Sequence, residues 1–292
     1  MTQILGQGEQ PVIIIGAGRS GTNALRDALC TLRNFHTWPC DEINYIWRHG
    51  NRNFPTDELT PTHATDDVVS FIRSEFQNQS VKDPSATLVE KTCANSLRVG
   101  FVHKVFPGAR FIHIVRDGRD VAASAMDRWT APLDLPYIAA KARFVPKSDL
   151  PFYAMSYLGS RVSKIRSAED RLSWWGPKFE GMELLTPETP LEEVAATQWA
   201  RCLMLAFEQL AEVPQEQVAT VRYQDLATKP ADVLEELLTW LGSDSSEKAL
   251  QIAASTIHAG SIGKWQSVLS EEQVDNLAPI VAPGLELIGG MP

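Results

Sequence analysis

A glycine-rich turn near the N-terminus has the residue types and the spacing of an anion-binding site. The turn, Gly-Ala-Gly-Arg-Ser-Gly at residues 16–21, follows a β-branched apolar run at 12–15 and precedes apolar residues at helical spacing between 22 and 32. At such a junction the first N–H groups of the helix lack internal partners, and the helix dipole favours negative charge. The glycines let the backbone approach the anion closely. We therefore expect a phosphate or sulfate group to bind here, contacted by Gly18, Arg19, Ser20, Gly21, Thr22 and Asn23.

The turn by itself is compatible with more than one kind of site. Gly-x-Gly-x-x-Gly is also the dinucleotide fingerprint, and Gly-x-x-x-x-Gly is the first half of the nucleoside triphosphatase loop. That loop continues with Lys and then Ser or Thr, which bind the outer phosphates and magnesium, whereas this chain continues with Thr22 and Asn23. Its cation, Arg19, lies inside the turn instead. A glycine turn without a ligand is the remaining interpretation of the motif.

Two further cations follow predicted strands. The segment 87–90 ends at Lys91, and the segment 110–115 ends at Arg116. Strands that alternate with helices predict a parallel sheet, and such sheets place their sites at the carboxyl ends of the strands. We therefore expect Arg19, Lys91 and Arg116 to meet at one edge of the sheet.

The remaining pattern predicts one α/β domain over residues 1–292, with a central parallel sheet of four or five strands flanked by helices. A fourth strand is expected at 218–221. Residues 131–189, rich in Pro, Tyr, Trp and Arg, are interpreted as a helical and loop insertion, which is either a lid on the acceptor side or a packed aromatic unit. Helices are expected at 66–77, at 96–106 with Asn95 as cap, at 191–210, and from Pro230 to Gly242.

Composition excludes several classes of protein. The chain has 292 residues, 44% of them hydrophobic, a net charge of −9, and no run of five basic residues, which argues against nucleic-acid binding through diffuse charge. Its four cysteines form no C-x-x-C pair and are expected to be free thiols, and no metal site is expected. The sequence has no apolar signal segment and no stretch of about 20 apolar residues, so a cytoplasmic chain without a membrane segment is expected.

Three separated motifs resemble those of sulfotransferases that use 3′-phosphoadenosine 5′-phosphosulfate (PAPS) as sulfo donor. Residues 19–22 match the 5′-phosphosulfate loop, residues 115–119 together with Ser124 match the 3′-phosphate motif, and residues 260–265 resemble the late Gly-x-x-Gly-x-Trp element. The motif spacing is closest to the tyrosylprotein and carbohydrate branches. One departure is that the Arg-Lys-Gly found before the late motif in the small-molecule branch reads His-Ala-Gly at 258–260.

The resemblance implies a phosphate-loop nucleotide-binding fold, sulfo transfer to a hydroxyl, and no metal. It makes Lys91 the cation at the leaving oxygen and Arg19 a ligand of the 5′-phosphosulfate. Tyr223 and Lys264 match residues that contact the nucleotide. For the 3′-phosphate, Arg116 and the Ser124 hydroxyl could close on one group if the helix between them folds back over the strand end.

A general base must accept the proton of the acceptor hydroxyl. The tyrosylprotein branch has a glutamate soon after the first helix, and Glu42 occupies that place. Asp41 and His36 are alternative bases. The acceptor is a saccharide, a peptidyl tyrosine or a small metabolite, and its choice depends on residues 131–189. The sequence does not indicate an oligomeric state.

Two other functions are compatible with parts of the sequence. A flavin- or NAD-dependent oxidoreductase would use the glycine turn and an acid about 20 residues later, at Asp41 or Glu42. That acid should end a second strand, whereas residues 35–40 do not form an uninterrupted β-run, and the motif from Arg116 to Ser124 would have no role. A non-catalytic nucleotide-binding member of the fold is the second alternative.

Overall fold

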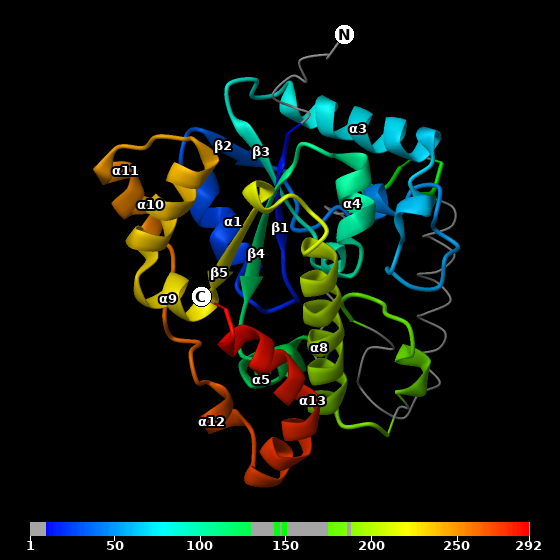
Figure 1. The fold of residues 1–292 in the computed structure, drawn as a ribbon, viewed down its shortest axis with the longest axis vertical. Coiled ribbons are helices and arrows are strands. Elements are labelled where there is room, and N and C mark those ends of the chain that lie inside the picture. Colours follow the sequence, from blue (N-terminus) through cyan, green and yellow to red (C-terminus); the bar gives the residue numbers. More distant parts are fainter. Residues whose placement is uncertain (1–9, 130–142, 147, 151–174, 186–187, 292) are drawn as a thin grey trace.

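The computed structural model describes residues 10–129, 143–146, 148–150, 175–185 and 188–291. Its centre is a parallel sheet of five strands in the order β2-β3-β1-β4-β5 (Figure 1). The strands are β1 (Val12–Ile15), β2 (Phe35–Thr37), β3 (Thr87–Lys91), β4 (Arg110–Val115) and β5 (Val218–Arg222). The prediction of a parallel α/β sheet with four or five strands is confirmed.

The central strand β1 is buried along its whole length, which explains its continuous apolar sequence. In the parallel register, Ile14 pairs with Lys91 of β3 on one side and with Ile112 of β4 on the other. Lys91 is the last residue of β3, and Arg116 follows the last residue of β4. The carboxyl ends of these three strands therefore meet beside the glycine turn.

The short strand β2 corrects one sequence prediction. Residues 35–37 pair in parallel with β3, although the sequence was interpreted as having no strand there. The run is only three residues long before Trp38 and Pro39, too short for a periodicity argument. The order of the sheet nevertheless argues against the dinucleotide fold, because β3 and not β2 lies beside β1, while that fold places its second strand next to the first.

Helices cover both faces of the sheet (Figure 1). One face packs against α1 (Thr22–Thr31), α9 (Tyr223–Thr228), α10 (Pro230–Leu241) and α11 (Glu247–Ala254). The other packs against α2 (Asn44–Trp47), α3 (Asp66–Ser80), α4 (Val99–Val105) and α8 (Leu191–Leu210). Short 3-10 turns lie at Pro61–His63, Cys93–Leu97, Met182–Leu184 and Gln215–Gln217.

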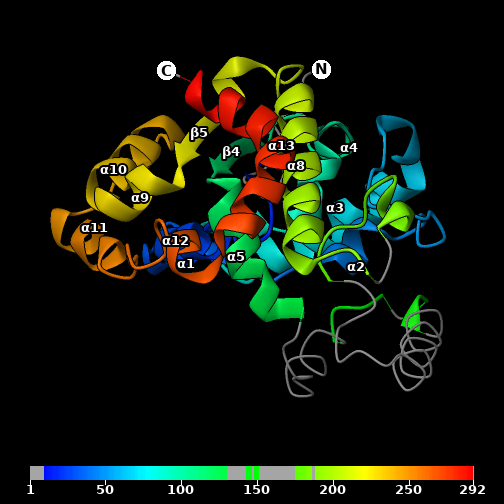
Figure 2. The same cartoon turned by 90° about the horizontal axis from the view of Figure 1, so that it is seen from below.

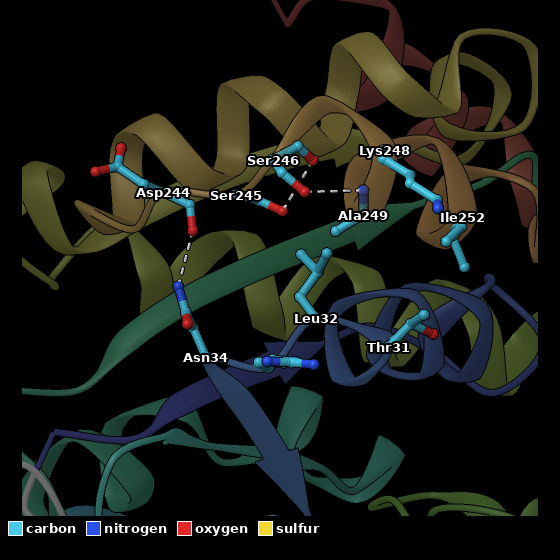
Figure 3. Close-up of a pocket in the computed structure, with 10 residues that line it drawn as sticks. Thr31, Leu32, Asn34, Asp244, Ser245, Ser246, Lys248, Ala249 and Ile252 are labelled. Carbon is cyan, nitrogen blue, oxygen red and sulfur yellow. Dashed lines mark hydrogen bonds between the residues drawn. The ribbon is translucent and has the colours of Figure 1, made fainter.

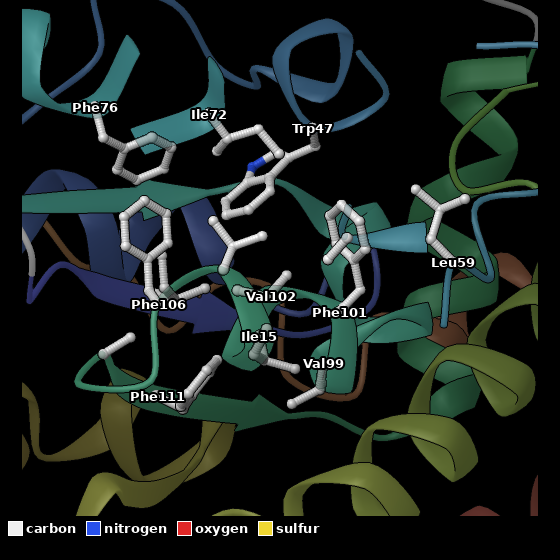
Figure 4. Close-up of a cluster of buried hydrophobic side chains, with 14 of the residues drawn as sticks. Ile15, Trp47, Leu59, Ile72, Phe76, Val99, Phe101, Val102, Phe106 and Phe111 are labelled. Atoms are coloured by element: carbon white, nitrogen blue, oxygen red, sulfur yellow. The ribbon is translucent and has the colours of Figure 1, made fainter. Parts of the chain in front are cut away.

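Aromatic side chains fill the second of these cores. Trp47 packs edge-on against Phe76, Phe101 and Phe106, and Ile15 of β1 closes the cluster from the sheet (Figure 4). Such edge-to-face pairs add about 0.5–1.5 kcal/mol each beyond their buried area. The segment that carries residues 41–44 is thus attached to a rigid support.

A third group of helices covers the carboxyl end of the sheet. It consists of α5 (Gly118–Trp129), α12 (Trp265–Val268) and α13 (Glu271–Gly289), and α13 packs back along α8 (Figures 1 and 2). Trp199 of α8 is fully buried in this layer, and its Nε1 donates a hydrogen bond to the carbonyl of Arg116 at 3.1 Å. The end of β4 is thereby fixed relative to α8.

The predicted element bounds hold closely except around Asn95. The expected helix at 96–106 is a 3-10 turn, Cys93–Leu97, followed by α4, and Arg98 rather than Asn95 precedes α4. The side chain of Asn95 is bound to Glu90 and Arg98 instead of capping the helix. All four cysteines are free thiols. Most of residues 131–189, and with them the predicted insertion, lie outside the described residues.

Candidate anion-binding and transfer site

The glycine turn after β1 is packed too closely for larger residues at two positions. A Cβ atom at Gly16 would lie 2.8 Å from the carbonyl oxygen of Ile114, and one at Gly21 would lie 2.3 Å from the Tyr223 ring. Gly21 also has a φ of 93° and precedes the first turn of α1. The glycines therefore allow β4 and the residue that follows β5, Tyr223, to approach the turn.

Arg19 is the only non-glycine residue with positive φ (70°) among the described residues. A left-handed conformation costs a residue with a Cβ about 1–2 kcal/mol, and such strain is often found at functional sites. Its Nε donates a hydrogen bond to Ser124 Oγ of α5 at 3.0 Å. Burial lowers the pKa of the Arg19 guanidinium, and the positive charges of Arg128 and Arg116 lower it further. An anion bound at this turn would relieve that repulsion.

Arg116 bridges the turn and the late motif. Its Nη1 donates to the carbonyl oxygen of Arg19 at 2.9 Å, and its Nη2 donates to the carbonyl oxygen of Ser261. The guanidinium lies 4.3 Å from the centre of the Tyr223 ring and 3.6 Å from the Asp120 carboxylate. Its buried Nε has no hydrogen-bond partner within the described part of the chain.

Ser124 contacts the glycine turn through Arg19. Its hydroxyl accepts a hydrogen bond from the Arg19 side chain, and the expectation that Ser124 and Arg116 close on one phosphate stays a prediction. Arg116 binds the Arg19 backbone, so both residues contact Arg19 from different sides. The reason is that α5 begins at Gly118 and its second turn passes over the glycine turn.

The late motif is attached to α5 through a carboxylate. Asp120 accepts hydrogen bonds from the backbone N–H groups of Gly263 (3.0 Å) and Trp265 (3.2 Å). Lys264, between them, pairs with Asp127 at 3.6 Å, and its side chain is 40% exposed. The motif thus lies beside the cations, with its lysine at the solvent-facing edge.

Lys91 and Glu42 form the second half of the site. Lys91 Nζ lies 2.9 Å from Glu42 Oε1, and the same oxygen accepts the backbone N–H of Cys93 at 3.3 Å. The lysine side chain is 3% exposed and the glutamate side chain 28%. Burial opposes the charge on Lys91, but the neighbouring Cys93 and Glu42 outweigh it and raise the pKa of the ammonium. Lys91 is therefore charged throughout the physiological range.

Three contacts join the residues next to Lys91 and Glu42 to α1, the helix that follows the glycine turn. Thr22 Oγ1, at the start of α1, lies 3.8 Å from Cys93 Sγ. Arg26, one turn later, donates to the carbonyl oxygen of Asp41 at 3.1 Å and contacts its carboxylate at 3.4 Å. The structure thus places Glu42 rather than Asp41 against Lys91. His36 lies on β2, where burial lowers the pKa of its imidazole.

Sequence reasoning missed one residue at the turn. The ring of Trp175 covers Gly18, where a Cβ atom would lie 3.3 Å from Trp175 Cη2. Gln198 of α8 holds this segment by donating to the carbonyl oxygens of Trp175 (2.9 Å) and Pro177 (3.0 Å). The aromatic-rich sequence of residues 131–189 indicated that this segment could be functional, but no pattern in it predicted a contact between Trp175 and Gly18.

Two other kinds of site could lie among the described residues: a metal site and a second pocket. No group of three or more His, Cys, Asp or Glu side chains that could hold a metal occurs among them. A surface pocket of about 410 Å³ lies between the end of α1 and the start of α11, lined by residues that include Asn34, Asp244 and Ser246 (Figure 3). The ten residues of α1 separate it from the glycine turn by about 15 Å.

Comparisons with known proteins agree with this geometry. The sequence profile of the sulfotransferase family matches residues 11–143, which include the glycine turn, Glu42, Lys91 and Arg116. A search of curated protein sequences finds no significant match. In the residues that the structure describes, no helix has the length and apolar character needed to cross a membrane.

Several solved structures have the same fold at low sequence identity. Sulfotransferase STF9 from Mycobacterium avium is 14% identical, with a TM-score of 0.54 over 95% of this chain and 76% of that one. The sulfotransferase domain of the Synechococcus PCC 7002 olefin synthase is 16% identical (TM-score 0.52; 94% and 95%). A sulfotransferase from Alicyclobacillus acidocaldarius is 15% identical (TM-score 0.51; 94% and 92%). The family match over residues 11–143 and the shared fold confirm the resemblance: this part of the chain matches the sulfotransferase family, and the chain has the fold of solved sulfotransferases.

Proposed function

We propose that the chain transfers a sulfo group from PAPS to a hydroxyl acceptor. One observation carries the proposal: the cations Arg19, Lys91 and Arg116 come from three strand ends and lie around one glycine turn, with Glu42 hydrogen-bonded to Lys91. Cations at two positions around the turn suit a donor that carries phosphate groups at both its 3′ and 5′ ends. The family match over residues 11–143 supports the same chemistry.

The glycine turn is the proposed site of the 5′-phosphosulfate. The N–H groups of Gly21 to Asn23 lie at the start of α1, where the helix dipole favours an anion, while the Ser20 N–H is bound to the Ala17 carbonyl oxygen at 3.2 Å. Gly18 allows the backbone to come close, and Arg19 supplies a half-buried positive charge near the positive charges of Arg128 and Arg116. These features make the turn more attractive to a doubly charged group than to a neutral one.

The proposed 3′-phosphate site is formed by Arg116, beside the glycine turn. Its guanidinium is 6% exposed and held from both sides by backbone carbonyls, so little side-chain entropy is lost on binding. Ser124 and Lys264 are the expected additional donors, and Tyr223 is the expected aromatic contact. The cation–π contact of Arg116 with Tyr223 adds about 1–2 kcal/mol to this preorganisation.

Lys91 is the proposed catalytic cation. Sulfo transfer develops negative charge on the oxygen between sulfur and the departing phosphate, and a preorganised cation in a buried site stabilises that charge. The raised pKa of Lys91 keeps it protonated, and its side chain is held on a rigid strand end. Arg19 would share this role from the side of the turn.

Glu42 is the proposed general base for the acceptor hydroxyl. A base must lie within hydrogen-bond reach of the proton it removes. Glu42 combines a partly exposed carboxylate with a fixed contact to Lys91, so it faces the site where charge develops. Proton transfer from the acceptor to Glu42 would also leave Lys91 unpaired and available to the leaving oxygen.

The acceptor is proposed to be a saccharide, a peptide or a small metabolite that carries a hydroxyl. We propose that residues 131–189 form the acceptor side of a single domain of residues 1–292. Trp175, which covers Gly18, is a described residue of that segment that contacts the glycine turn. It is therefore a proposed contact for the acceptor or for the transferred group.

Ligand-induced thermal shift is the first test of the donor. Adenosine 3′,5′-bisphosphate at about 100 times its Kd should stabilise the native state by about 2.7 kcal/mol, because it binds the folded chain alone. NAD, FAD and ATP at the same concentration should shift the melting temperature less. A larger shift with NAD or FAD would overturn the proposal in favour of an oxidoreductase.

A transfer assay then separates an enzyme from a binding protein. PAPS labelled in the sulfo group is incubated with the chain and a panel of saccharides, tyrosine peptides and phenols, and labelled product is separated by chromatography. We expect transfer to at least one class of acceptor, and transfer by Lys91→Ala that is slower by about 10²- to 10³-fold. Donor binding without transfer to any member of the panel would support a non-catalytic nucleotide-binding role.

A further inference from the structure

A buried carboxylate lies directly behind the Lys91–Glu42 pair without touching it. Glu90 precedes Lys91 on β3, so its side chain points to the opposite face of the sheet, and it is 1% exposed. Burying a carboxylate is costly unless it is hydrogen-bonded. None of the roles proposed above uses this residue, so its presence needs another explanation.

The first oxygen of Glu90 is connected to the backbone beside Glu42 by two hydrogen bonds through Thr92. Thr92 Oγ1 donates its hydrogen to Glu90 Oε1 at 2.5 Å. A hydroxyl has one hydrogen to donate, so Thr92 Oγ1 must act as acceptor in its second contact, the N–H of Ile43 at 3.1 Å. That N–H belongs to the peptide group that joins Glu42 to Ile43. The chain of two bonds therefore fixes the backbone on the C-terminal side of Glu42.

The second oxygen of Glu90 is connected by hydrogen bonds to Asn44, the residue that follows Ile43. Glu90 Oε2 accepts from Asn95 Nδ2 at 2.9 Å, and Asn95 Oδ1 accepts from Arg98 Nε at 2.9 Å. Arg98 Nη2 in turn donates to Asn44 Oδ1 at 2.5 Å. One carboxylate thus reaches two consecutive residues, Ile43 and Asn44, by separate routes.

The other side of Glu42 is fixed from a different element. Arg26 of α1 donates to the carbonyl oxygen of Asp41. Residues 41–43 belong to no helix or strand, so no regular backbone hydrogen bonds hold them. The side-chain bonds to Asp41, Ile43 and Asn44 fix the segment instead. The Glu42 carboxylate is then placed between two anchored neighbours, within reach of Lys91.

We propose that Glu90, acting through the Thr92 hydroxyl, is a positioning residue that holds Glu42 in place against Lys91. The kinetic part of this inference rests on the proposed function of Glu42, while the structural part does not. Displacement of a catalytic group by about 1 Å can cost about 100-fold in rate. Such a loss would explain why the fold keeps a buried carboxyl group at this position.

Replacement of Thr92 gives the sharpest test, because two variants differ by the hydroxyl. Thr92→Val keeps the shape and removes both hydrogen bonds, whereas Thr92→Ser keeps the hydroxyl. In crystal structures we expect Glu42 to leave Lys91 in Thr92→Val and to stay in Thr92→Ser. An unmoved Glu42 carboxylate in Thr92→Val would overturn the proposal, whether or not the chain transfers sulfo groups.

Kinetics test the consequence for the reaction. Thr92→Val should lower kcat at least tenfold with an unchanged KM for the donor, and Thr92→Ser should recover most of the loss. Combined with Glu42→Gln, Thr92→Val should cause no further loss, because its effect acts through Glu42. Additive losses would show a merely structural role and overturn the proposal.

Two additional measurements separate the possible failures. If Thr92→Val does not fold, Glu90→Gln is the second variant, and the same displacement of Glu42 is expected because the amide has one oxygen where Glu90 has two that accept from Thr92 and Asn95. If the wild-type chain transfers no sulfo group to any acceptor, the proposed function fails, while the crystal structures still decide the positioning role. Binding of adenosine 3′,5′-bisphosphate should be retained in every variant.

Discussion

Lys91 and Glu42 are 49 residues apart in the sequence and form an ion pair whose Nζ and Oε1 atoms lie 2.9 Å apart. The pair is asymmetric: the lysine is buried and fixed at a strand end, while the glutamate is partly exposed on a segment anchored by other residues. A fixed cation beside an accessible carboxylate is suited to a reaction in which one stabilises developing charge and the other accepts a proton.

Replacement of the cation should separate catalysis from binding. Lys91→Ala should lower kcat by about 10²- to 10³-fold, the typical loss when one preorganised group that stabilises developing charge is removed. Donor affinity should fall much less, because Arg19 and Arg116 are unchanged. Steady-state kinetics and calorimetry with adenosine 3′,5′-bisphosphate check both values. An unchanged kcat would remove Lys91 from the mechanism.

Arg116 and Arg119, three residues apart, give a test variant and a control variant for binding of the donor. Arg116 faces the glycine turn, whereas Arg119 pairs with Asp117 at 2.6 Å and stacks on Trp265. Arg116→Ala should weaken binding of adenosine 3′,5′-bisphosphate by about 10- to 100-fold, the loss expected for charge-assisted hydrogen bonds. Arg119→Ala should leave the Kd within about threefold, since its pair is partly exposed. Equal effects in calorimetry would refute the assignment of Arg116.

The strained backbone of Arg19 permits a test that separates strain from charge. Arg19→Ala and Arg19→Gly both remove the guanidinium and its bond to Ser124, but only glycine adopts a φ of 70° without strain. Arg19→Gly should therefore be more stable than Arg19→Ala by about 1 kcal/mol in urea denaturation. Both should bind adenosine 3′,5′-bisphosphate equally poorly. Retained binding in either variant would show that Arg19 does not contact the donor.

The elements that the sequence predicted best are those whose pattern is local. The helix at 191–210 and the strand at 110–115 match their predictions residue for residue, because an uninterrupted periodicity or β-run determines them. The strand at 35–37 and the 3-10 turn at 93–97 escaped prediction. Neither depends on a periodic pattern: β2 depends on pairing with the distant strand β3, and the turn on a side-chain hydrogen bond that Asn95 donates to Glu90.

The same distinction applies to the site. Cations at strand ends could be predicted, because parallel topology brings the carboxyl ends of strands together. The contact between Ser124 and Arg19 could not, since it depends on how far α5 turns back over the glycine turn. Nor could Trp175, whose position over Gly18 is set by the hydrogen bonds of Gln198 from α8. Motifs therefore indicated which residues lie together, and packing decided which atoms they contact.

Two buried titratable groups on the sheet should give opposite contributions to the pH dependence of stability. Burial raises the pKa of Glu90 to about 7, so between pH 4.5 and 7 the native state keeps a proton that the unfolded chain has lost. The free energy of unfolding then falls as pH rises through this range, by about 3 kcal/mol. Burial lowers the pKa of His113 to about 4, so between pH 6.5 and 4 the unfolded chain binds the extra proton. Its contribution to stability, also about 3 kcal/mol, is lost as pH falls.

Over the shared range from pH 4.5 to 6.5 these two contributions cancel, and each should appear when the other is removed. Relative to wild type, Glu90→Gln should gain stability steadily as pH rises from 4.5 to 6.5, because only the His113 contribution is left. His113→Leu should lose stability over the same interval, because only the Glu90 contribution is left. Urea denaturation at pH 4.5, 5.5 and 6.5 measures these slopes, and the double variant should again match the slope of wild type. A Glu90→Gln slope equal to that of wild type would mean that Glu90 is ionised across this range in the folded chain, as in the unfolded one.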